Sequence, residues 1–269
     1  MANLNKATQD HLVAVSNKLA VVSRTKALAS FRMSGLFTEN KDADGFDPVT
    51  KADRDAEAAM RDVLAVERPD DGIIGEEFPP VEGSSGLTWV LDPIDGTRSY
   101  ICGAPTWGVL IAVSDETGPL MGMIDQPYIG ERFVGGFGRA EYDGPFGVRP
   151  LKTRPARPLS EATILTTFPE VGTDEEGRAF HSVSRRGQLT RYGMDCYGYA
   201  LLALGQVDLV IEAGLNAYDI QAPIAVIQAA GGIVTDWAGG PAHNGGRALA
   251  AANPQIHAEA LDILRGVTG

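Results

Sequence analysis

The chain has 269 residues, of which 44% are hydrophobic and 22% charged, enough for a sizeable core in one domain or two fused halves. Its formal net charge of -12 argues against binding to the phosphate backbone of nucleic acid. No apolar leader follows Lys6, no segment is long enough to span a bilayer, and the two cysteines, Cys102 and Cys196, lie far apart. We therefore expect a cytoplasmic protein with no membrane contact, disulfide framework or zinc site.

The first seventy residues are expected to hold two helices joined by an irregular segment. Apolar side chains recur at helical spacing from Leu12 to Val22, which predicts a long amphipathic helix within the first thirty residues. Residues 31–46 lack periodicity and are expected to form a mobile loop or a short hairpin. A second helix is predicted to begin near Thr50, where Thr50 and Asp53 fit a capping box, and to end before Pro69.

Short apolar runs predict the strands that follow. In the first half these lie at residues 73–74, 88–91, 107–113, 119–124 and 132–134. The stretch 144–158 is rich in Gly, Pro and Arg and is the predicted boundary between an N-terminal α+β half, residues 1–150, with a central antiparallel sheet, and a C-terminal α/β half, residues 151–269. The second half alternates strands at 162–166, 207–211 and 233–235 with helices at 196–204, 220–230 and 256–264. A meander followed by such alternation predicts a layered protein of the α/β (α+β) class.

The segment 89–97 carries the strongest chemical signal. An apolar run, expected to be a buried strand, is broken by Pro93 and Gly96, so that Asp92, Asp95, the Ile94 carbonyl and the Thr97 hydroxyl share one tight turn. These hard oxygen donors are the ligands that Mg2+ prefers. An ordinary acidic turn at a strand end is the alternative interpretation of this segment alone.

Further acids are expected at the edge of the fold. Glu76 and Asp219 each follow an apolar segment, as Asp92 and Asp95 do, and residues placed in this way often form ligand sites. Taken singly, each could be a solvated acid or a helix cap. Asp219 could cap its own helix, and Asp53 has a capping role that does not exclude a second one.

Together these motifs resemble the inositol monophosphatase superfamily of Mg2+-dependent, lithium-sensitive phosphatases. The resemblance rests on Glu76-Glu77, on the segment 92–97, on Tyr218-Asp219 followed by residues 229–232, and on the segment 47–53, and it covers about residues 40 to 235 in the family's order. One departure is Tyr218, where many members carry Trp.

The resemblance implies an αβαβα layered sandwich, with the metal-site loops in the N-terminal half, and two or three Mg2+ ions for which Mn2+ could substitute. The implied metal ligands are Glu76, Asp92, the Ile94 carbonyl, Asp95 and Asp219. Thr97 and Asp53 would orient the attacking water and, with Glu76, form the catalytic set, whereas Lys41 lies near the position of a basic residue in the metal-site loop. Asp95, Gly96 and Thr97 would contact the substrate. A homodimer is also implied.

The chemistry that follows is hydrolysis of a phosphate monoester. Clustered carboxylates would repel a phosphate dianion, so the site requires divalent ions that neutralise the acids, bind phosphate oxygens and lower the pKa of a bound water. We expect direct in-line attack by that water. The alternative is a covalent phosphoaspartate on Asp92 or Asp95.

The organic part of the substrate is indicated by less generic segments. Residues 192–197 with the following apolar helix, residues 98–101 and residues 207–212 resemble the histidinol-phosphate phosphatase branch, an activity of histidine biosynthesis. Asp195 and Glu212 would accept hydrogen bonds from the ammonium or imidazole of histidinol phosphate. Asp195 could instead be the N-cap of its helix, and Glu212 could bind hydroxyls. The open alternatives are inositol-1-phosphate or another sugar or polyol phosphate, a 3′-phosphoadenosine ester, and a catalytically weak metal-binding regulator.

Overall fold

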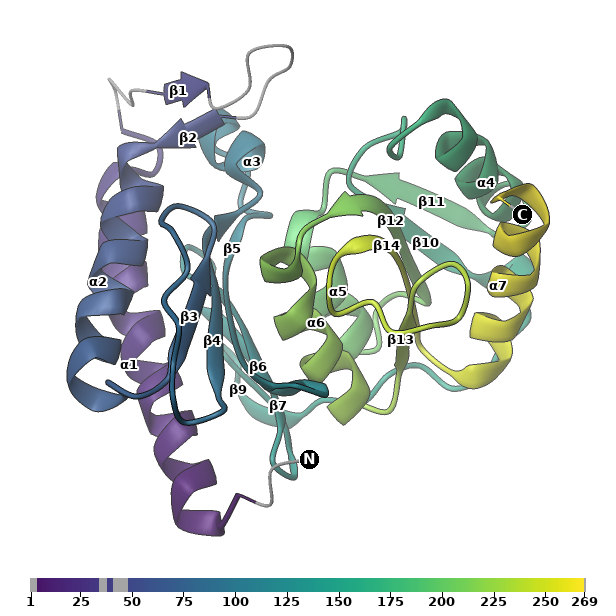
Figure 1. Ribbon diagram of the computed structural model, residues 1–269. Coiled ribbons are helices and arrows are strands. Elements are labelled where there is room, and N and C mark those ends of the chain that lie inside the picture. Colours follow the sequence, from purple (N-terminus) through teal and green to yellow (C-terminus); the bar gives the residue numbers. More distant parts are fainter. Residues whose placement is uncertain (1–3, 34–37, 41–47, 269) are drawn as a thin grey trace.

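The computed structural model describes residues 4–33, 38–40 and 48–268 and arranges its larger helices and sheets in five layers (Figure 1). Two helices cover one face of a seven-stranded sheet, two more lie between that sheet and a five-stranded sheet, and two cover the outer face of the second sheet. The predicted α/β class and the αβαβα order are both confirmed.

The first outer layer consists of α1 (Lys6–Ser30) and α2 (Lys51–Glu67), which pack against each other and the seven-stranded sheet. The helical periodicity predicted α1 correctly, since Leu12 and Leu19 are buried on one face. The predicted capping box is also present: the backbone N–H of Thr50 donates to the carboxylate of Asp53 over 2.9 Å. Before α2, the strands β1 (Thr38–Asn40) and β2 (Pro48–Thr50) pair antiparallel.

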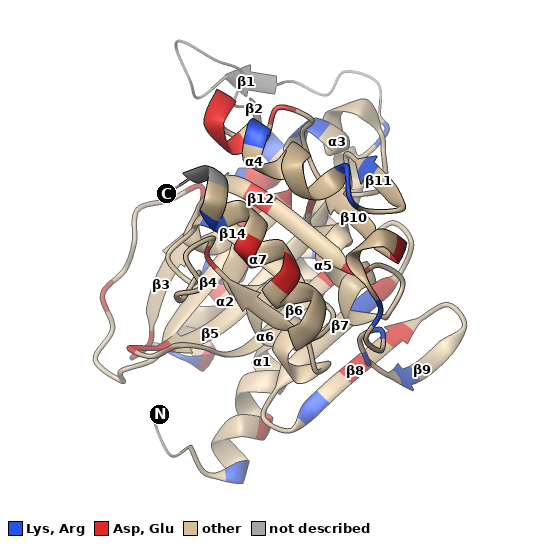
Figure 2. Ribbon diagram, turned by 90° about the vertical axis from the view of Figure 1, so that its right-hand side faces the viewer, with Lys and Arg blue, Asp and Glu red and all other residues tan. Residues whose placement is uncertain are grey.

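The seven-stranded sheet follows chain order from β3 to β9. Its strands are β3 (Gly72–Gly75), β4 (Thr88–Asp95), β5 (Gly108–Asp115), β6 (Gly118–Gln126), β7 (Glu131–Gly136), β8 (Arg139–Gly144) and β9 (Gly147–Pro150). β3 and β4 are parallel and the other neighbours are antiparallel. β8 and β9, which were not predicted, project as a hairpin (Figure 2). The exposed edge strand β9 lacks the apolar alternation that marks a half-buried strand.

The five-stranded sheet has the order β11-β10-β12-β14-β13. Its strands are β10 (Thr163–Thr166), β11 (Leu189–Tyr192), β12 (Leu209–Leu215), β13 (Ile233–Thr235) and β14 (Gly246–Ala251). The short 3-10 turn at Leu159–Glu161 leads into β10, and the outer helices α4 (Asp174–Ser184) and α7 (Pro254–Thr268) cover this sheet. α4, β11 and β14 were not predicted, whereas the strands near 162–166, 207–211 and 233–235 were.

The middle layer consists of α5 (Asp195–Ala203) and α6 (Ala217–Ala229). α6 begins three residues before its predicted start, so Pro223 lies in its second turn. One continuous apolar cluster joins the sheets through these helices: Val90 of β4, Ile220 of α6 and Val210 of β12 all belong to it. Because both halves share this cluster, the division at residues 150 and 151 into two units stays a prediction.

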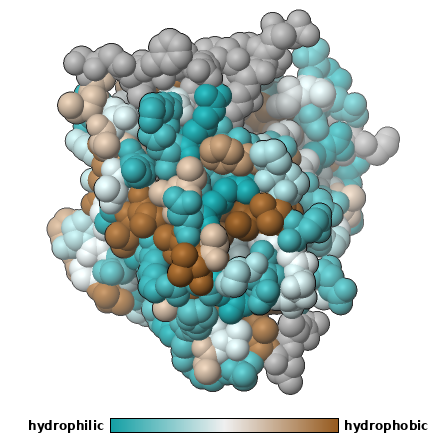
Figure 3. Space-filling model, turned by 60° about the vertical axis from the view of Figure 1, so that its left-hand side comes forward, coloured by the Kyte–Doolittle hydropathy of each residue, from teal (hydrophilic) through white to brown (hydrophobic). Residues whose placement is uncertain are grey.

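The molecular surface mixes polar and apolar areas. On the face drawn in Figure 3, apolar patches lie near the middle among hydrophilic residues, and acidic and basic residues are interspersed on the face drawn in Figure 2. Within the described ranges, no helix is long and apolar enough to cross a membrane. The cytoplasmic location and the homodimer stay predictions.

Candidate active site

A β-bulge at the end of β4 brings Asp92 and Asp95 together. Asp92 pairs with Leu110 of β5 and Asp95 with Gly108, so three steps along β4 oppose two steps along β5. Side chains three positions apart on a regular strand point to opposite faces, and the extra residue cancels this alternation. Asp92 also accepts a hydrogen bond from the backbone N–H of Ile94 over 3.0 Å, which fixes the turn.

Asp219 completes a cluster of three carboxylates. It lies at the third position of α6, where its Oδ2 accepts a 2.7 Å hydrogen bond from the backbone N–H of Asn216, so the helix-capping interpretation is correct. One oxygen from each of Asp92, Asp95 and Asp219 lies within 4.8 Å of the others. Three hard, anionic donors at such mutual distances fit a divalent cation, because a single ion can coordinate all of them and offset most of their charge.

The electrostatics of these acids agree with that fit. Burial raises the pKa of Asp92 well above its usual range, and the neighbouring carboxylates of Glu76, Asp95 and Asp219 raise it further. Burial also raises the pKa of Asp95, and among the neighbouring charges Asp219 raises it most. Carboxylates that disfavour ionisation together are stabilised when a cation enters between them.

Glu76 lies at the same cavity but outside the closest group. It follows β3, lines the cavity beside Asp92, and is not among the three acids whose oxygens lie within 4.8 Å. The Ile94 carbonyl, the other expected ligand, accepts a 3.2 Å hydrogen bond from Oγ1 of Thr97. Lys41 lies outside the described residues.

Thr97 and Asp53 meet across 44 positions of sequence. The single proton of the Thr97 hydroxyl has two acceptors within reach, the Ile94 carbonyl at 3.2 Å and Oδ1 of Asp53 at 3.4 Å. The other oxygen of Asp53 accepts from the backbone N–H of Thr50. Asp53 is fully buried. The start of α2 is thereby joined to the start of α3 (Thr97–Cys102), which follows the left-handed residue Gly96.

Asp195 does not cap its helix. The N-cap of α5 is Met194, and Asp195 itself has the unusual φ of 47° for a residue other than glycine. Its Oδ2 accepts hydrogen bonds from the hydroxyls of Ser99 (2.6 Å) and Thr106 (2.7 Å). The N-cap alternative is therefore wrong. Burial raises the pKa of Asp195 even though both hydroxyls lower it.

Glu212 is held deep in the same cavity. Its carboxylate accepts hydrogen bonds from the hydroxyl of Thr166 (3.1 Å) and from the backbone and hydroxyl of Thr167 (2.7 and 2.9 Å). Burial raises the pKa of Glu212 to about 7, against the lowering effect of these bonds. Glu212, Asp195 and the three clustered carboxylates line one cavity of about 280 Å3, which Tyr218 and Phe168 also border.

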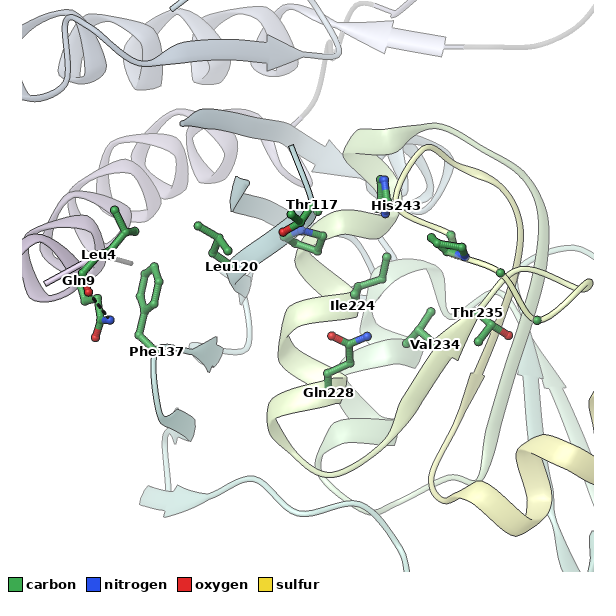
Figure 4. A pocket seen from close by; sticks show the side chains of 16 residues that line it. Leu4, Gln9, Thr117, Leu120, Phe137, Ile224, Gln228, Val234, Thr235 and His243 are labelled. Carbon is green, nitrogen blue, oxygen red and sulfur yellow. Dashed lines mark hydrogen bonds between the residues drawn. The ribbon is translucent and has the colours of Figure 1, made fainter. Parts of the chain in front are cut away.

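The largest of the cavities described is elsewhere. It has a volume of about 1030 Å3 and lies between the start of α1, the β5–β6 turn and α6 (Figure 4). Gln228, Thr235 and His243 line it, and no carboxylate does. Its size is therefore no guide to a metal site, whereas the carboxylates that line the smaller cavity suit a cation.

Comparisons with known proteins agree with this geometry. A sequence model of the inositol monophosphatase family matches residues 8–267. The chain belongs to the inositol monophosphatase family. It is thus a phosphoric monoester hydrolase of a metal-dependent family, as its motifs predicted.

Two relatives and one solved structure show the range of this family. The chain is 38% identical over 98% of its length to the bifunctional phosphatase IMPL2 of Arabidopsis thaliana, covering 78% of that protein. It is 34% identical to a histidinol-phosphatase of Streptomyces coelicolor, covering 94% of both chains. An inositol monophosphatase structure from Zymomonas mobilis has a TM-score of 0.84 at 36% identity, covering 97% of this chain and 100% of that one. Histidinol and inositol phosphatases thus resemble this chain about equally.

Several contacts that shape the site were not predicted from the sequence. The backbone N–H of Cys196 binds Asp95, the hydroxyls of Ser99 and Thr106 bind Asp195, and the hydroxyls of Thr166 and Thr167 bind Glu212. Serine and threonine are common, and each of these contacts joins segments far apart in the chain. Only the order of the strands and helices brings them to the site.

Proposed function

We propose that this family member hydrolyses a small phosphate monoester with Mg2+ held by Glu76, Asp92, the Ile94 carbonyl, Asp95 and Asp219. The observation that carries the proposal is the approach of three carboxylate oxygens, from the buried Asp92 and the half-buried Asp95 and Asp219, to within 4.8 Å of one another. When bound, the ions would neutralise these acids, polarise the phosphoryl oxygens and acidify a water. Mn2+ could take the same oxygen ligands.

Thr97 and Asp53 are proposed to orient the attacking water. A hydroxyl that donates its proton to Oδ1 of Asp53 keeps its lone pairs, which can accept a hydrogen bond from water. The water oxygen forms a bond to phosphorus, the ester P–O bond breaks, and the leaving oxygen takes up a proton. Gly96 and Thr97 would contact the phosphate, together with Asp95. No covalent phosphoaspartate is required, and a trapped one would contradict this route.

Histidinol phosphate is the proposed substrate. Two carboxylates outside the closest acid group, Asp195 and Glu212, border the cavity and would accept hydrogen bonds from a cationic substituent. The histidinol-phosphatase of Streptomyces coelicolor, at 34% identity, supports this choice. Inositol-1-phosphate or another polyol phosphate is the second candidate, because Glu212 can equally accept hydrogen bonds from hydroxyls and the 36% identical Zymomonas mobilis structure is an inositol monophosphatase.

A phosphate-release panel tests both levels of the proposal. The purified chain is assayed with and without Mg2+ on histidinol phosphate, inositol-1-phosphate, fructose-1,6-bisphosphate and 3′-phosphoadenosine 5′-phosphate. We expect Mg2+-dependent release, with the highest kcat/KM on histidinol phosphate. A preference for inositol-1-phosphate would reject the substrate and keep the hydrolase. No release from any ester would favour a catalytically weak regulator.

A further inference from the structure

We infer that Glu57 and Arg61 of α2 are positioning residues that hold the segment carrying Glu76 in place for metal binding. This inference rests on the proposed role of Glu76 as a metal ligand. It starts from a buried carboxylate, fully excluded from solvent, for which the sequence analysis assigned no function. Glu57 lies one helical turn after Asp53, so the two acids share a face of α2.

The carboxylate of Glu57 lies against the backbone on both sides of Glu76. Its Oε2 accepts a 2.7 Å hydrogen bond from the backbone N–H of Glu77. On the other side, a Cβ at Gly75 would lie 2.1 Å from Oε1 of Glu57, so only glycine permits this approach of backbone to carboxylate. Glu76 is the residue between these two positions, so its backbone is held by a hydrogen bond on one side and packed closely against the same carboxylate on the other.

Arg61 completes the attachment. Its Nε donates to Oε1 of Glu57 over 2.8 Å, and its Nη2 donates to the carbonyl of Phe78 over 3.1 Å. The guanidinium also lies 5.6 Å from the centre of the Phe78 ring. Both charged groups are largely buried, at 16% exposure for the Arg61 side chain and 0% for that of Glu57. A buried, hydrogen-bonded pair of this kind fixes geometry more firmly than an exposed ion pair.

The consequence is that one helix sets two parts of the site. α2 holds Thr97 through Asp53 at its first turn and the Glu76 segment through Glu57 at its second turn. An α-helix is stiff over one turn, so the spacing between these two parts is constant. Partners that orient metal ligands typically change metal affinity about 10- to 100-fold when removed.

The test measures Mg2+ affinity directly. Isothermal calorimetry with Mg2+ alone, and the Mg2+ dependence of phosphate release, are compared for wild type, Glu57→Ala, Glu57→Gln and Arg61→Met. We expect Glu57→Ala to weaken Mg2+ binding about 10- to 100-fold by both measurements. Glu57→Gln keeps an acceptor for the Glu77 N–H and should show a smaller loss. If Glu57→Ala does not fold, the Mg2+ affinity of Glu57→Gln tests the inference in its place.

A matched control separates positioning from stability. Asp71 stands just before β3, at the other end of the strand that leads to Glu76, and it too is a buried acid paired with an arginine, Arg68, over 2.6 Å. Asp71→Asn should lower the melting temperature and leave Mg2+ affinity unchanged. Equal loss of Mg2+ affinity in Asp71→Asn and Glu57→Gln would overturn the inference, since instability would then be the cause.

A double-mutant cycle links the effect to Glu76. In a Glu76→Gln background, Glu57→Ala should change Mg2+ affinity less than about threefold, because the ligand that Glu57 positions is gone. Additive losses would overturn the inference. Wild-type protein that neither binds Mg2+ nor releases phosphate would instead reject the proposed function, so the two failures are distinguishable.

Discussion

The backbone N–H of Cys196 donates a 2.6 Å hydrogen bond to Oδ2 of Asp95, across 101 positions of sequence. The bond joins the first turn of α5 in the middle layer to the bulged end of β4 in the seven-stranded sheet. Because it orients one carboxylate of the acid cluster from the opposite half of the chain, packing between the layers and the geometry of the site are coupled.

Removing one charge of the acid cluster should abolish turnover while sparing the fold. For Asp92→Asn and Asp95→Asn we expect Mg2+-dependent phosphate release to fall by several orders of magnitude, and the rise of melting temperature with added Mg2+ to disappear. The metal-free variants should be at least as stable as wild type, because burial and like charge disfavour the ionised forms of both acids.

Asp236→Asn is the control for this pair. Oδ1 of Asp236 accepts from the backbone N–H two residues on, over 2.8 Å, as Oδ1 of Asp92 does, but in a turn outside the acid cluster. It should leave turnover and the Mg2+-induced shift intact. Near-normal turnover in Asp95→Asn would contradict the assignment of the metal ligands.

The hydroxyl of Thr97 should matter for rate and little for stability. Thr97→Val keeps the shape and removes the group that donates toward Asp53, so kcat should fall about 10²- to 10⁴-fold. Thr97→Ser restores the hydroxyl and should recover most of the rate. Comparable rates for Thr97→Val and wild type under saturating substrate and Mg2+ would exclude this role.

Asp53 should affect both rate and stability. Asp53→Asn weakens the capping box of α2 at a cost of about 1 kcal/mol and also removes the carboxylate partner of Thr97. Glu176→Gln makes the same change in the capping box of α4, where Thr173 is the N-cap, and should cost stability alone. Equal kcat values for these two variants would show that Asp53 only caps its helix.

Gly96 should tolerate no side chain, for two separate reasons. Its φ of 85° is left-handed, and a Cβ there would lie 2.7 Å from Cγ of Asp195, which Ser99 and Thr106 hold in place. Gly86 has a similar φ of 82° with nothing within 4 Å of such a Cβ. Gly86→Ala should therefore lower the free energy of unfolding by about 1 kcal/mol, and Gly96→Ala by clearly more. If urea unfolding shows the same loss of unfolding free energy for both variants, the Asp195 side chain can move aside at little cost.

Glu212 should make the metal-free protein less stable as pH rises. Its folded-state pKa is about 7 against an ordinary 4.5, so the unfolded chain loses this proton first and ionisation disfavours folding across that window. In EDTA, the stability of Glu212→Gln relative to wild type should increase between about pH 5 and pH 8, by at most about 3 kcal/mol.

Glu176→Gln is the control for this pH dependence, because the pKa of Glu176 is shifted in the opposite direction from that of Glu212. The pKa of Glu176 is lowered, by the backbone of Thr173 and by Arg247, so the group is ionised in both states throughout this window. The stability of Glu176→Gln relative to wild type should therefore stay constant as pH rises. A constant difference for Glu212→Gln as well would show that Glu212 ionises normally in the folded protein.

The features predicted correctly from the sequence are those that short-range interactions control. Helical periodicity marked α1, the Thr50–Asp53 pair marked the start of α2, and apolar runs marked the central strands, because each of these patterns is written within a few neighbouring residues. The acid motifs identified the family, and the metal ligands that they imply stay a prediction. Elements without such a pattern, above all the exposed edge strand β9 and the short helix α3, could not be predicted in this way.

The way in which the acids meet depends on the packing of the whole fold. A bulge in β4 turns Asp92 and Asp95 to one side, and α6 delivers Asp219 from the far half of the chain. The orientation of Asp195 depends on hydroxyls about 90 positions away, with spacings of 96 to Ser99 and 89 to Thr106. Contacts of this kind depend on how layers pack against one another, and no local sequence pattern encodes the distance between two side chains that the fold alone brings together.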